Sequence, residues 1–418
     1  MRKAIAAAAA VIVIIATALP ASPELYIDIV SSPRKLPVAI MDLEGQQGGD
    51  ISDIIRNDLS LSSVFAPMDP SGFTERKDQD FDPGNWIGTG AEAVIKGTVE
   101  HTDELVVTIR LYDVVEGRLI MEKKYRAGST MLRPLSHAAA NDIFEKITGQ
   151  KTVFRTKIAY VSADSDGNFS LNVADWDGMR SRRLNVRARS LLSPHWAPDA
   201  QSIAYTAERE RKWGIFSLDF ATMKEEPLLE IKGTSIAGDF FPNGRSMALS
   251  SSIKGSTDIY ILDIKEKKLK RMTRDMGIEV SPTVSPDGKS LAFVSDRSGS
   301  PQIYTMDTMG YNKSRITFEG GYNTSPSWSP RGDLIAFSGR YGGRNQIFTV
   351  WPDGTGLRML TASGNNEEPS FSPDGRFITF TSDREAKQTV YVMGVDGSGQ
   401  RRISPKGIEA FSPRWSPR

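Results

Sequence analysis

Short apolar runs separated by polar turns recur at a fixed interval through the second half of the chain. The clearest sign is a Ser-Pro-Asp-Gly turn at 285–288 and again at 372–375, with related sequences at equivalent places. The prolines of these turns, here called the anchor prolines, are spaced by 44, 44, 44, 43 and 44 residues; they are Pro198, Pro242, Pro286, Pro330, Pro373 and Pro417. A period this regular indicates a repeat architecture.

Each repeat carries signals for four β-strands. In the repeat around Pro286, apolar runs occur at 283–284, 291–294, 303–306 and 315–318. The turn between the first two runs contains proline, which fixes φ, and glycine, which adopts a positive φ readily. Four short antiparallel strands in about 44 residues are typical of a β-propeller blade. The sequence therefore predicts an all-β, six-bladed β-propeller over residues 151–418.

The last blade is expected to combine two distant segments. The final anchor sequence, at 415–417, has no apolar strand after it, whereas residues 157–162 look like the second strand of a repeat that lacks an anchor. We expect the C-terminal strand to be the innermost strand of the blade that begins near residue 157. Such pairing closes the ring and leaves no exposed sheet edge between the two segments.

Residues 22–150 have a mixed pattern that predicts a smaller N-terminal α/β domain. Expected strands are 25–30, 38–41, 93–99, 105–112 and 119–125. Expected helices run from Asp50, as the capping residue, to residue 61 and from 131 to 147, where Gly149 ends the second helix. Residues 85–90 contain two glycines without the spacing of a nucleotide-binding loop, so we expect an ordinary loop there.

The first 21 residues predict a secretory signal peptide. Arg2 and Lys3 precede an alanine-rich apolar run, and small residues at 16–18 fit a cleavage site. The alternative is a membrane anchor, but the run is shorter than the ~20 apolar residues of a spanning helix and ends at Pro20. We expect an exported protein that is cleaved near residue 21.

Composition limits the chemistry. The formal net charge is +1, which argues against a nucleic-acid partner, and the chain has no cysteine and three histidines. Disulfides, cysteine-based metal sites and thiol nucleophiles are thereby excluded. No serine stands in the glycine-flanked sequence of a hydrolase nucleophile. We therefore expect no catalytic, metal-binding or cofactor-binding residues and no cofactor, although a cation in the propeller channel stays open.

The chain resembles the TolB family over essentially its whole length. The resemblance is carried by residues 24–30 and 37–40, by the junction segments 142–149 and 154–160, and by the final 415–417. It implies a non-enzymatic scaffold of the Gram-negative periplasm that belongs to the Tol–Pal system. The implied partners are the lipoprotein Pal and TolA of the inner-membrane TolQ–TolR–TolA complex. The implied role is outer-membrane constriction at cell division and envelope integrity, with bacteriocin import as a hijacked use.

The resemblance also suggests binding residues. Pal would contact the loops that enter the innermost strands, at Thr234, Ala237, Val280, Ser281, Asn323, Thr324, Glu367 and Glu368. Of these, Thr234 and Ser281 differ from the histidine and glutamate of the family pattern. TolA would contact the N-terminal segment, at Leu25, Tyr26, Ile27, Asp28, Ile29 and Val30. Two alternatives remain on sequence alone: a periplasmic propeller enzyme, and a glycan- or solute-binding propeller that uses the central channel.

Overall fold

The computed structural model describes residues 34–418 apart from Arg187 and Lys232. It divides into two compact units, one extending to Arg126 and including 145–149, the other comprising 127–144 and 150–418. The expected strand at 25–30 lies outside the described residues. In the part of the chain that is described, no helix is long and apolar enough to cross a bilayer.

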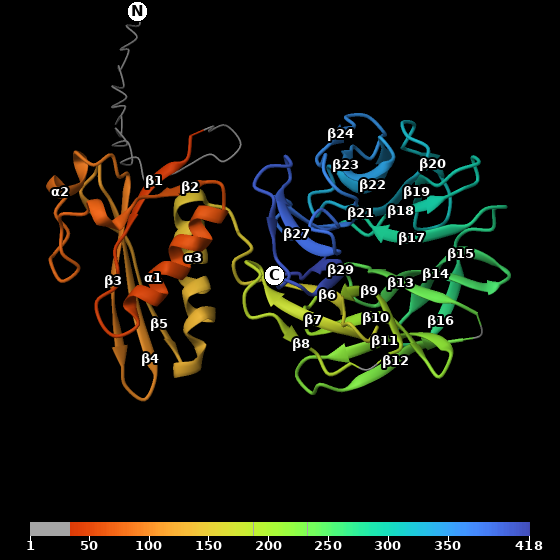
Figure 1. Ribbon diagram of the computed structural model, residues 1–418, viewed down its shortest axis with the longest axis horizontal. Coiled ribbons are helices and arrows are strands. Elements are labelled where there is room, and N and C mark those ends of the chain that lie inside the picture. Colours follow the sequence, from red (N-terminus) through yellow and green to blue (C-terminus); the bar gives the residue numbers. More distant parts are fainter. Residues whose placement is uncertain (1–33, 187, 232) are drawn as a thin grey trace, which may run out of the picture. The chain divides into compact units, whose positions relative to one another are not determined.

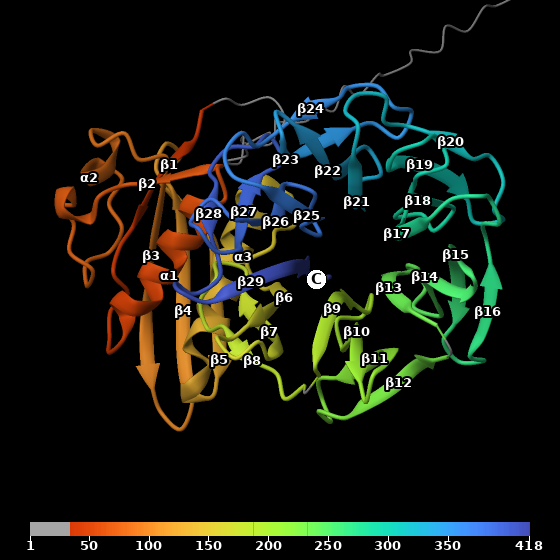
Figure 2. The ribbon, with the colours of Figure 1, turned by 45° about the vertical axis from the view of Figure 1, so that its right-hand side comes forward.

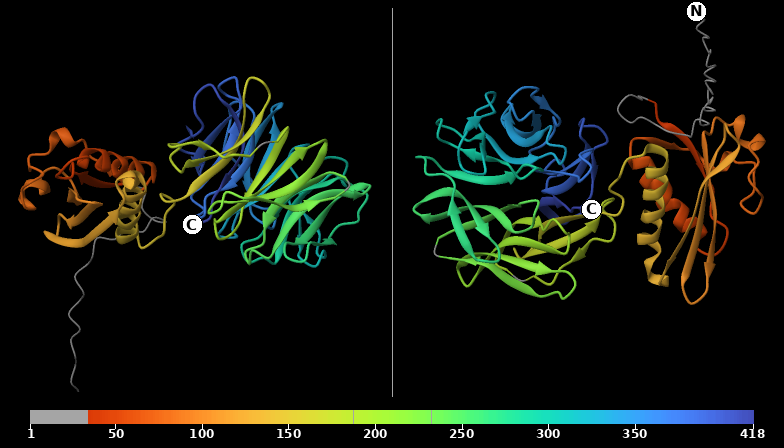
Figure 3. Two further views of the ribbon diagram at one scale, coloured as in Figure 1. Left: turned by 90° about the horizontal axis from the view of Figure 1, so that it is seen from below. Right: turned by 180° about the vertical axis from the view of Figure 1, so that it is seen from behind.

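The first unit is built on a five-stranded sheet with the order β2-β1-β3-β4-β5. Its strands are β1 (Leu36–Ile40), β2 (Phe65–Pro67), β3 (Ala93–His101), β4 (Leu105–Asp113) and β5 (Arg118–Ala127). Strand β1 is parallel to both of its neighbours, whereas β3 and β4 form an antiparallel hairpin. Helix α1 (Gly48–Leu61) lies beside this sheet and buries Ile51, Ile55 and Leu59 (Figure 3). The α/β character of this unit agrees with the prediction, although residues 127–144, with most of the second expected helix, belong to the other unit.

Three local expectations in this unit need correction. Helix α1 begins at Gly48 with Gln47 as its N-cap, so Asp50 lies in the first helical turn and does not cap it. Gln47 has a φ of 62°, and a Cβ on Gly48 would lie 1.9 Å from the Leu43 carbonyl oxygen, so the chain must turn tightly here. Strand β2 was not expected because it has only 3 residues. A short helix, α2 (Gly84–Ile87), occupies part of the expected loop.

Helix α3 (Leu132–Thr148) agrees with the prediction to within one residue at each end. Gly149 follows it with a φ of 66°, the left-handed conformation that commonly ends a helix. Within the second unit, the Phe144 ring meets the Phe154 ring edge-on at 5.7 Å, and the Arg376 guanidinium lies 4.4 Å from the centre of the Phe144 ring.

The second unit contains six four-stranded sheets arranged around a common centre (Figures 1 and 2). Blade 1 contains β9 (Ser190–Trp196), β10 (Ser202–Arg209), β11 (Lys212–Asp219) and β12 (Glu225–Glu230). Blade 2 contains β13 (Ser235–Phe240), β14 (Ser246–Lys254), β15 (Ser256–Asp263) and β16 (Lys268–Arg271). Blade 3 contains β17 (Glu279–Val284), β18 (Ser290–Ser295), β19 (Gln302–Asp307) and β20 (Ser314–Arg315).

The remaining sheets complete the ring. Blade 4 contains β21 (Asn323–Trp328), β22 (Ile335–Tyr341), β23 (Arg344–Val350) and β24 (Arg358–Met359). Blade 5 contains β25 (Asn366–Phe371), β26 (Phe377–Ser382), β27 (Thr389–Gly394) and β28 (Arg401–Arg402). Blade 6 contains β29 (Glu409–Trp415), β6 (Lys157–Ala163), β7 (Phe169–Asp175) and β8 (Arg182–Arg183). The six-bladed propeller predicted from the repeat is thus confirmed.

Blade 6 joins the two distant segments. Strand β29 is antiparallel to β6, with Trp415 opposite Ile158 and Phe411 opposite Val161. The buried indole N–H of Trp415 donates a hydrogen bond to the Thr156 hydroxyl at 2.7 Å. Strand β29 is therefore the innermost strand of blade 6, the position expected from the incomplete repeats.

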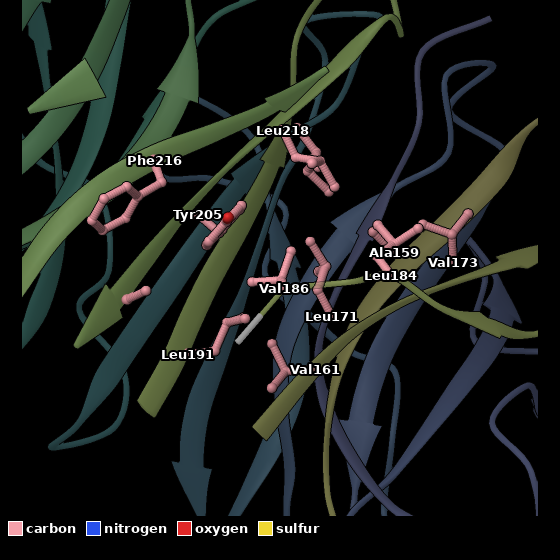
Figure 4. Close-up of a cluster of buried hydrophobic side chains, with 12 residues drawn as sticks. Ala159, Val161, Leu171, Val173, Leu184, Val186, Leu191, Tyr205, Phe216 and Leu218 are labelled. Atoms are coloured by element: carbon pink, nitrogen blue, oxygen red, sulfur yellow. The ribbon is translucent and has the colours of Figure 1, made fainter. Parts of the chain in front are cut away.

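Apolar layers between successive blades supply the core. Between blades 6 and 1, Val161 and Leu171 from one sheet pack with Leu191 and Tyr205 from the other (Figure 4). All four side chains are fully buried. Burying a side chain of this size contributes roughly 1.5–3 kcal/mol, so each inter-blade layer holds its neighbours in place by several such contributions.

Candidate functional site: the propeller channel and its entering-loop face

A repeated backbone feature shapes the centre of the propeller. Five of the six innermost strands carry a residue with a positive φ directly before a proline: Ser193, Ser281, Ser325, Glu368 and Ser412, with φ between 48° and 54°. Ladder register shifts occur beside all five of these residues. A bulge changes the direction of the side chains that follow it. In each of these strands, the residue two positions after the positive-φ residue therefore lines a common central cavity.

This cavity has a volume of about 80 Å³. One residue at the same place in each innermost strand lines it: His195, Asp239, Thr283, Ser327, Ser370 and Arg414. Each of these residues stands three positions before its anchor proline. The channel is therefore polar and carries charged groups of both signs.

Asp239 is the centre of the hydrogen bonding in the channel. Its carboxylate lies 2.8 Å from His195 Nδ1, and it accepts hydrogen bonds from the Thr283 hydroxyl at 2.5 Å and the Val284 N–H at 3.2 Å. Burial and the charge of Arg414 lower the pKa of His195, which favours the neutral imidazole. Burial raises the pKa of Asp239, but the hydrogen bond from His195 and the other donors outweigh it, so the net shift is downward. Asp239 therefore carries the negative charge of this pair.

Strand direction identifies two faces of the ring. In blades 1 to 5 the anchor turns lie between the first and second strands, and the loops between blades enter the first strand at the opposite face. We call the latter the entering-loop face. It also carries the loops between second and third strands, because successive antiparallel strands reverse direction.

Most of the residues expected to bind Pal lie within strands and not in loops, which corrects the sequence expectation. Thr234 precedes β13, whereas the other seven belong to β13, β17, β21 and β25: Ala237, Val280, Ser281, Asn323, Thr324, Glu367 and Glu368. The innermost strands begin earlier than the apolar pattern indicated because polar residues such as Glu279 and Asn323 already pair in the ladder.

These eight residues differ in accessibility. Thr234 and Ser281 are exposed, and Val280, Thr324, Glu367 and Glu368 are half-buried. Ala237 and Asn323 are only 3% and 2% exposed, so neither presents a side chain to a partner. The Asn323 amide donates to Gln302 Oε1 at 2.8 Å inside the ring.

Glu368 links two blades. Its carboxylate accepts hydrogen bonds from the Ser412 N–H and the Ser412 hydroxyl, both at 2.8 Å, and from the Thr381 hydroxyl at 3.2 Å. Ser412 belongs to β29, the closing strand of blade 6, whereas Glu368 and Thr381 belong to blade 5. The neighbouring Glu367 instead accepts a hydrogen bond from the Asn345 amide of blade 4.

Sequence reasoning missed the channel residues. Their signal was present, because His195, Asp239 and Arg414 occupy one fixed position in the repeat, but nothing in residue type alone marks that position as inward-facing. The residues expected to bind TolA, from Leu25 to Val30, lie outside the described part of the chain.

Comparison with protein families identifies the chain. The model of the TolB beta propeller domain matches residues 144–418, and that of the TolB amino-terminal domain matches residues 25–120. The chain belongs to the TolB family. The propeller and the α/β unit described above are thus the two domains of a TolB-family protein.

Individual TolB relatives agree with this assignment. The chain is 32% identical over 207 residues to the Tol-Pal system protein TolB of Polaromonas sp., covering 49% of this chain and 48% of the relative. It is 31% identical over 225 residues to the same-named protein of Chromobacterium violaceum, covering 51% and 52%. The chain spans about half the length of the curated relatives it matches.

Solved structures extend the comparison. The crystal structure of TolB from Acinetobacter baumannii superimposes with a TM-score of 0.85 and 28% identity, covering 92% of this chain and 97% of that one. A putative TolB from Agrobacterium tumefaciens gives a TM-score of 0.50 at 22% identity over 63% of this chain and 99% of that one, a likeness of fold alone.

Proposed function

We propose that this TolB-family chain is a periplasmic, non-enzymatic interaction protein of the Tol–Pal system in a Gram-negative envelope. It binds the lipoprotein Pal on the entering-loop face of the propeller and TolA through the N-terminal segment 25–30. Through these partners it supports outer-membrane constriction at cell division and envelope integrity, and bacteriocins use the same face. The observation that carries the proposal is the family match across both domains.

The chemistry of the entering-loop face supports a protein partner. Exposed Thr234 and Ser281 and half-buried Val280 and Thr324 give this face a mixed polar and apolar character. Such a composition is common in non-obligate protein interfaces. The buried Ala237 and Asn323 support the backbone beneath the face, and Glu368 holds the closing strand beside it.

The channel offers less support for an enzyme or a glycan-binding protein. Its cavity of about 80 Å³ is much smaller than the ~300–1,000 Å³ that holds a small-molecule ligand. His195 and Thr283 both hydrogen-bond to Asp239 and so bridge successive innermost strands, which holds the centre of the ring together.

Calorimetry with the mature chain and the soluble domain of Pal tests the lipoprotein part. Thr234→Trp, on the entering-loop face, should weaken Pal binding by at least about tenfold because a buried clash replaces a contact. Lys289→Trp provides the matched control, since Lys289 is exposed beside an anchor turn on the other face. Equal affinities for the two variants would place the Pal site elsewhere.

A deletion tests the TolA part separately. Removing residues 22–33 from the mature chain should abolish binding to TolA and leave Pal affinity unchanged, because the segment is distant in sequence from every innermost strand. A deletion variant that still binds TolA with the affinity of the full mature chain would refute the assignment of Leu25 to Val30.

A further inference from the structure

One structural element recurs in three blades of the propeller. In blades 1, 3 and 5, an aromatic pair is stacked between the second and third strands: Tyr205 with Phe216, Phe293 with Tyr304, and Phe380 with Tyr391. An arginine covers each pair, with its guanidinium 4.1 Å, 4.9 Å and 4.6 Å from a ring centre; these are Arg209, Arg297 and Arg384. Each of these arginines stands eleven residues after its anchor proline.

Polar partners hold the covering arginines in place. Arg209 forms an ion pair with Glu225, and Arg297 forms ion pairs with Glu279 and with Asp275 at 3.0 Å. In blade 5, Arg384 donates to Gln400 Oε1 at 2.6 Å and to Asn366 Oδ1 at 2.9 Å. The space over each aromatic pair is therefore filled by a fixed guanidinium.

Blade 4 has the aromatic pair without the cover. Phe337 and Phe348 are stacked at 5.6 Å, but the eleventh residue after the anchor proline is Tyr341, which is 65% exposed. Leu357 occupies the position of Glu225 in blade 1 and Gln400 in blade 5, so that polar partner is missing, whereas Asn323 keeps the position of Asn366. Blade 2 differs from all four, with Ile253 at the covering position and Leu249 in place of the first aromatic residue.

A pocket of about 210 Å³ occupies the uncovered space in blade 4. Phe337, Phe348, Leu357 and Tyr341 supply its apolar walls, and Arg340 and Glu319 lie at its rim. It opens on the entering-loop face, because Glu319 belongs to the loop before β21 and Tyr341 ends β22. Its volume is below the ~300–1,000 Å³ of typical small-molecule sites, so one large side chain fits it better than a whole ligand.

The charge at the rim favours an acidic partner. Arg340 and Arg344 are exposed, and neither forms an ion pair among the residues that the structure describes. Arg344 lies opposite Tyr341 across the β22–β23 hairpin. In blades 3 and 5 the residue matching Arg340 is Asp296 or Asp383, which binds a backbone N–H of the entering loop, so blade 4 reverses the sign of charge here. The nearby carboxylates are those of Glu319 and of Asp383. Burial raises the pKa of Asp383, but its hydrogen bonds and the charge of Arg344 outweigh it, so the net shift is downward. Within the described residues neither carboxylate forms an ion pair with the two arginines, so both guanidinium groups can bind carboxylates of a partner.

We propose that the blade 4 pocket is a docking site for an acidic protein segment that inserts one aromatic side chain. The aromatic ring stacks over Phe337 and Phe348, where blades 1, 3 and 5 place a guanidinium, and flanking carboxylates pair with Arg340 and Arg344. Aromatic side chains bury large areas and gain from stacked or edge-on contacts, and charge-assisted hydrogen bonds fix orientation. The inference concerns a surface of this chain and does not depend on the identity of the natural partner.

Saturation-transfer NMR with a short probe peptide tests the proposal on the full mature chain. The probe is acetylated, amidated Asp-Trp-Asp, compared with Asp-Ala-Asp and Asn-Trp-Asn. We expect Asp-Trp-Asp to bind with a dissociation constant of about 0.1–1 mM, an affinity that the burial of one large side chain can provide. Absence of saturable binding up to ~5 mM, or equal binding of Asp-Ala-Asp, would overturn the proposal.

Variants locate the binding. Tyr341→Arg gives blade 4 the covering residue of blades 1, 3 and 5 and should reduce Asp-Trp-Asp affinity at least about tenfold. Leu357→Trp fills the pocket without adding charge and should do the same, so the test survives if one variant fails to fold. Tyr341→Phe should bind like the unaltered chain. Arg340→Gln should weaken Asp-Trp-Asp but not Asn-Trp-Asn. Unchanged affinity in both pocket-filling variants would exclude this pocket.

Discussion

The hydrogen bonds of Glu368 give a direct test of how the ring is closed. Replacing Glu368 by alanine removes the acceptor for the Ser412 N–H, the Ser412 hydroxyl and the Thr381 hydroxyl. The closing strand β29 then loses its hydrogen bonds to Glu368. It keeps the ladder to β6 and two weaker hydrogen bonds to blade 5, from the Ser412 N–H to the Thr381 hydroxyl and from the Trp415 N–H to the Ser370 hydroxyl, both at 3.2 Å. We therefore expect a loss of stability concentrated in β29.

The size of the effect follows from the number and kind of bonds. A hydrogen bond to a charged group contributes about 1.5–3 kcal/mol net, and less where the acceptor is partly exposed. Because Glu368 is half-buried, three bonds together give about 2–4 kcal/mol. For a domain of this size, about 2–4 °C per kcal/mol converts this loss to a fall in Tm of roughly 5–15 °C.

Calorimetry and hydrogen exchange measure the two aspects of this prediction. The propeller transition of Glu368→Ala should move down by the stated amount, and amides of 409–415 should exchange faster than those of blade 3. Glu367→Ala is the matched control, since the neighbouring carboxylate bonds to Asn345 and not to β29. A Tm within about 2 °C of the unaltered chain, with unchanged exchange in β29, would refute the reasoning.

Three further outcomes are expected. Deleting residues 411–418 should unfold the propeller at 37 °C, because β6 loses its inner partner strand; circular dichroism showing an unchanged transition would contradict this. In Lys96→Met the fully buried Glu75 carboxylate loses its cation, so chemical denaturation should give a loss of about 3–5 kcal/mol for the first unit, whereas a loss below ~1 kcal/mol would contradict it. Burial raises the pKa of Asp175, but the hydrogen bonds from His137 and Lys157 outweigh it and hold the pKa well below its usual range. In the acid range the unfolded chain then binds more protons than the folded chain. The contribution of Asp175 to the free energy of unfolding is therefore complete above about pH 5 and is lost as the pH falls through 4 and below. In Asp175→Asn, the free energy of unfolding should fall less steeply over this pH range.

The architecture could be predicted because each blade repeats one local pattern. The spacing of the anchor prolines fixes the length of the unit, and the Ser-Pro-Asp-Gly turn fixes the first hairpin. The pairing of β29 with β6 followed from two incomplete repeats, since each lacked what the other supplied. In this half of the chain, the turn sequence within each repeat and the spacing of the repeats therefore predict the same fold.

The details of the candidate site could not be predicted in the same way. Ser281 and Glu368 adopt a left-handed backbone that serine and glutamate disfavour, and only the bulged ladder around them imposes it. Without that bulge, the inward position of Asp239 or the direction of the Glu368 carboxylate does not follow from sequence. The short strand β2 lacks any pattern of its own, because three residues are too few to show a period.

The central claim is that the entering-loop face of the propeller meets the lipoprotein Pal. A photo-cross-linking residue placed at Thr234 in the full chain, expressed in its own cell envelope, tests this claim most directly. A second chain carries the same residue at Lys289, beside the anchor turn of blade 3 on the other face. We predict that illumination joins Pal to the residue at 234 and not to that at 289. A cross-link of Pal at 289 alone, or at neither position, would contradict the account.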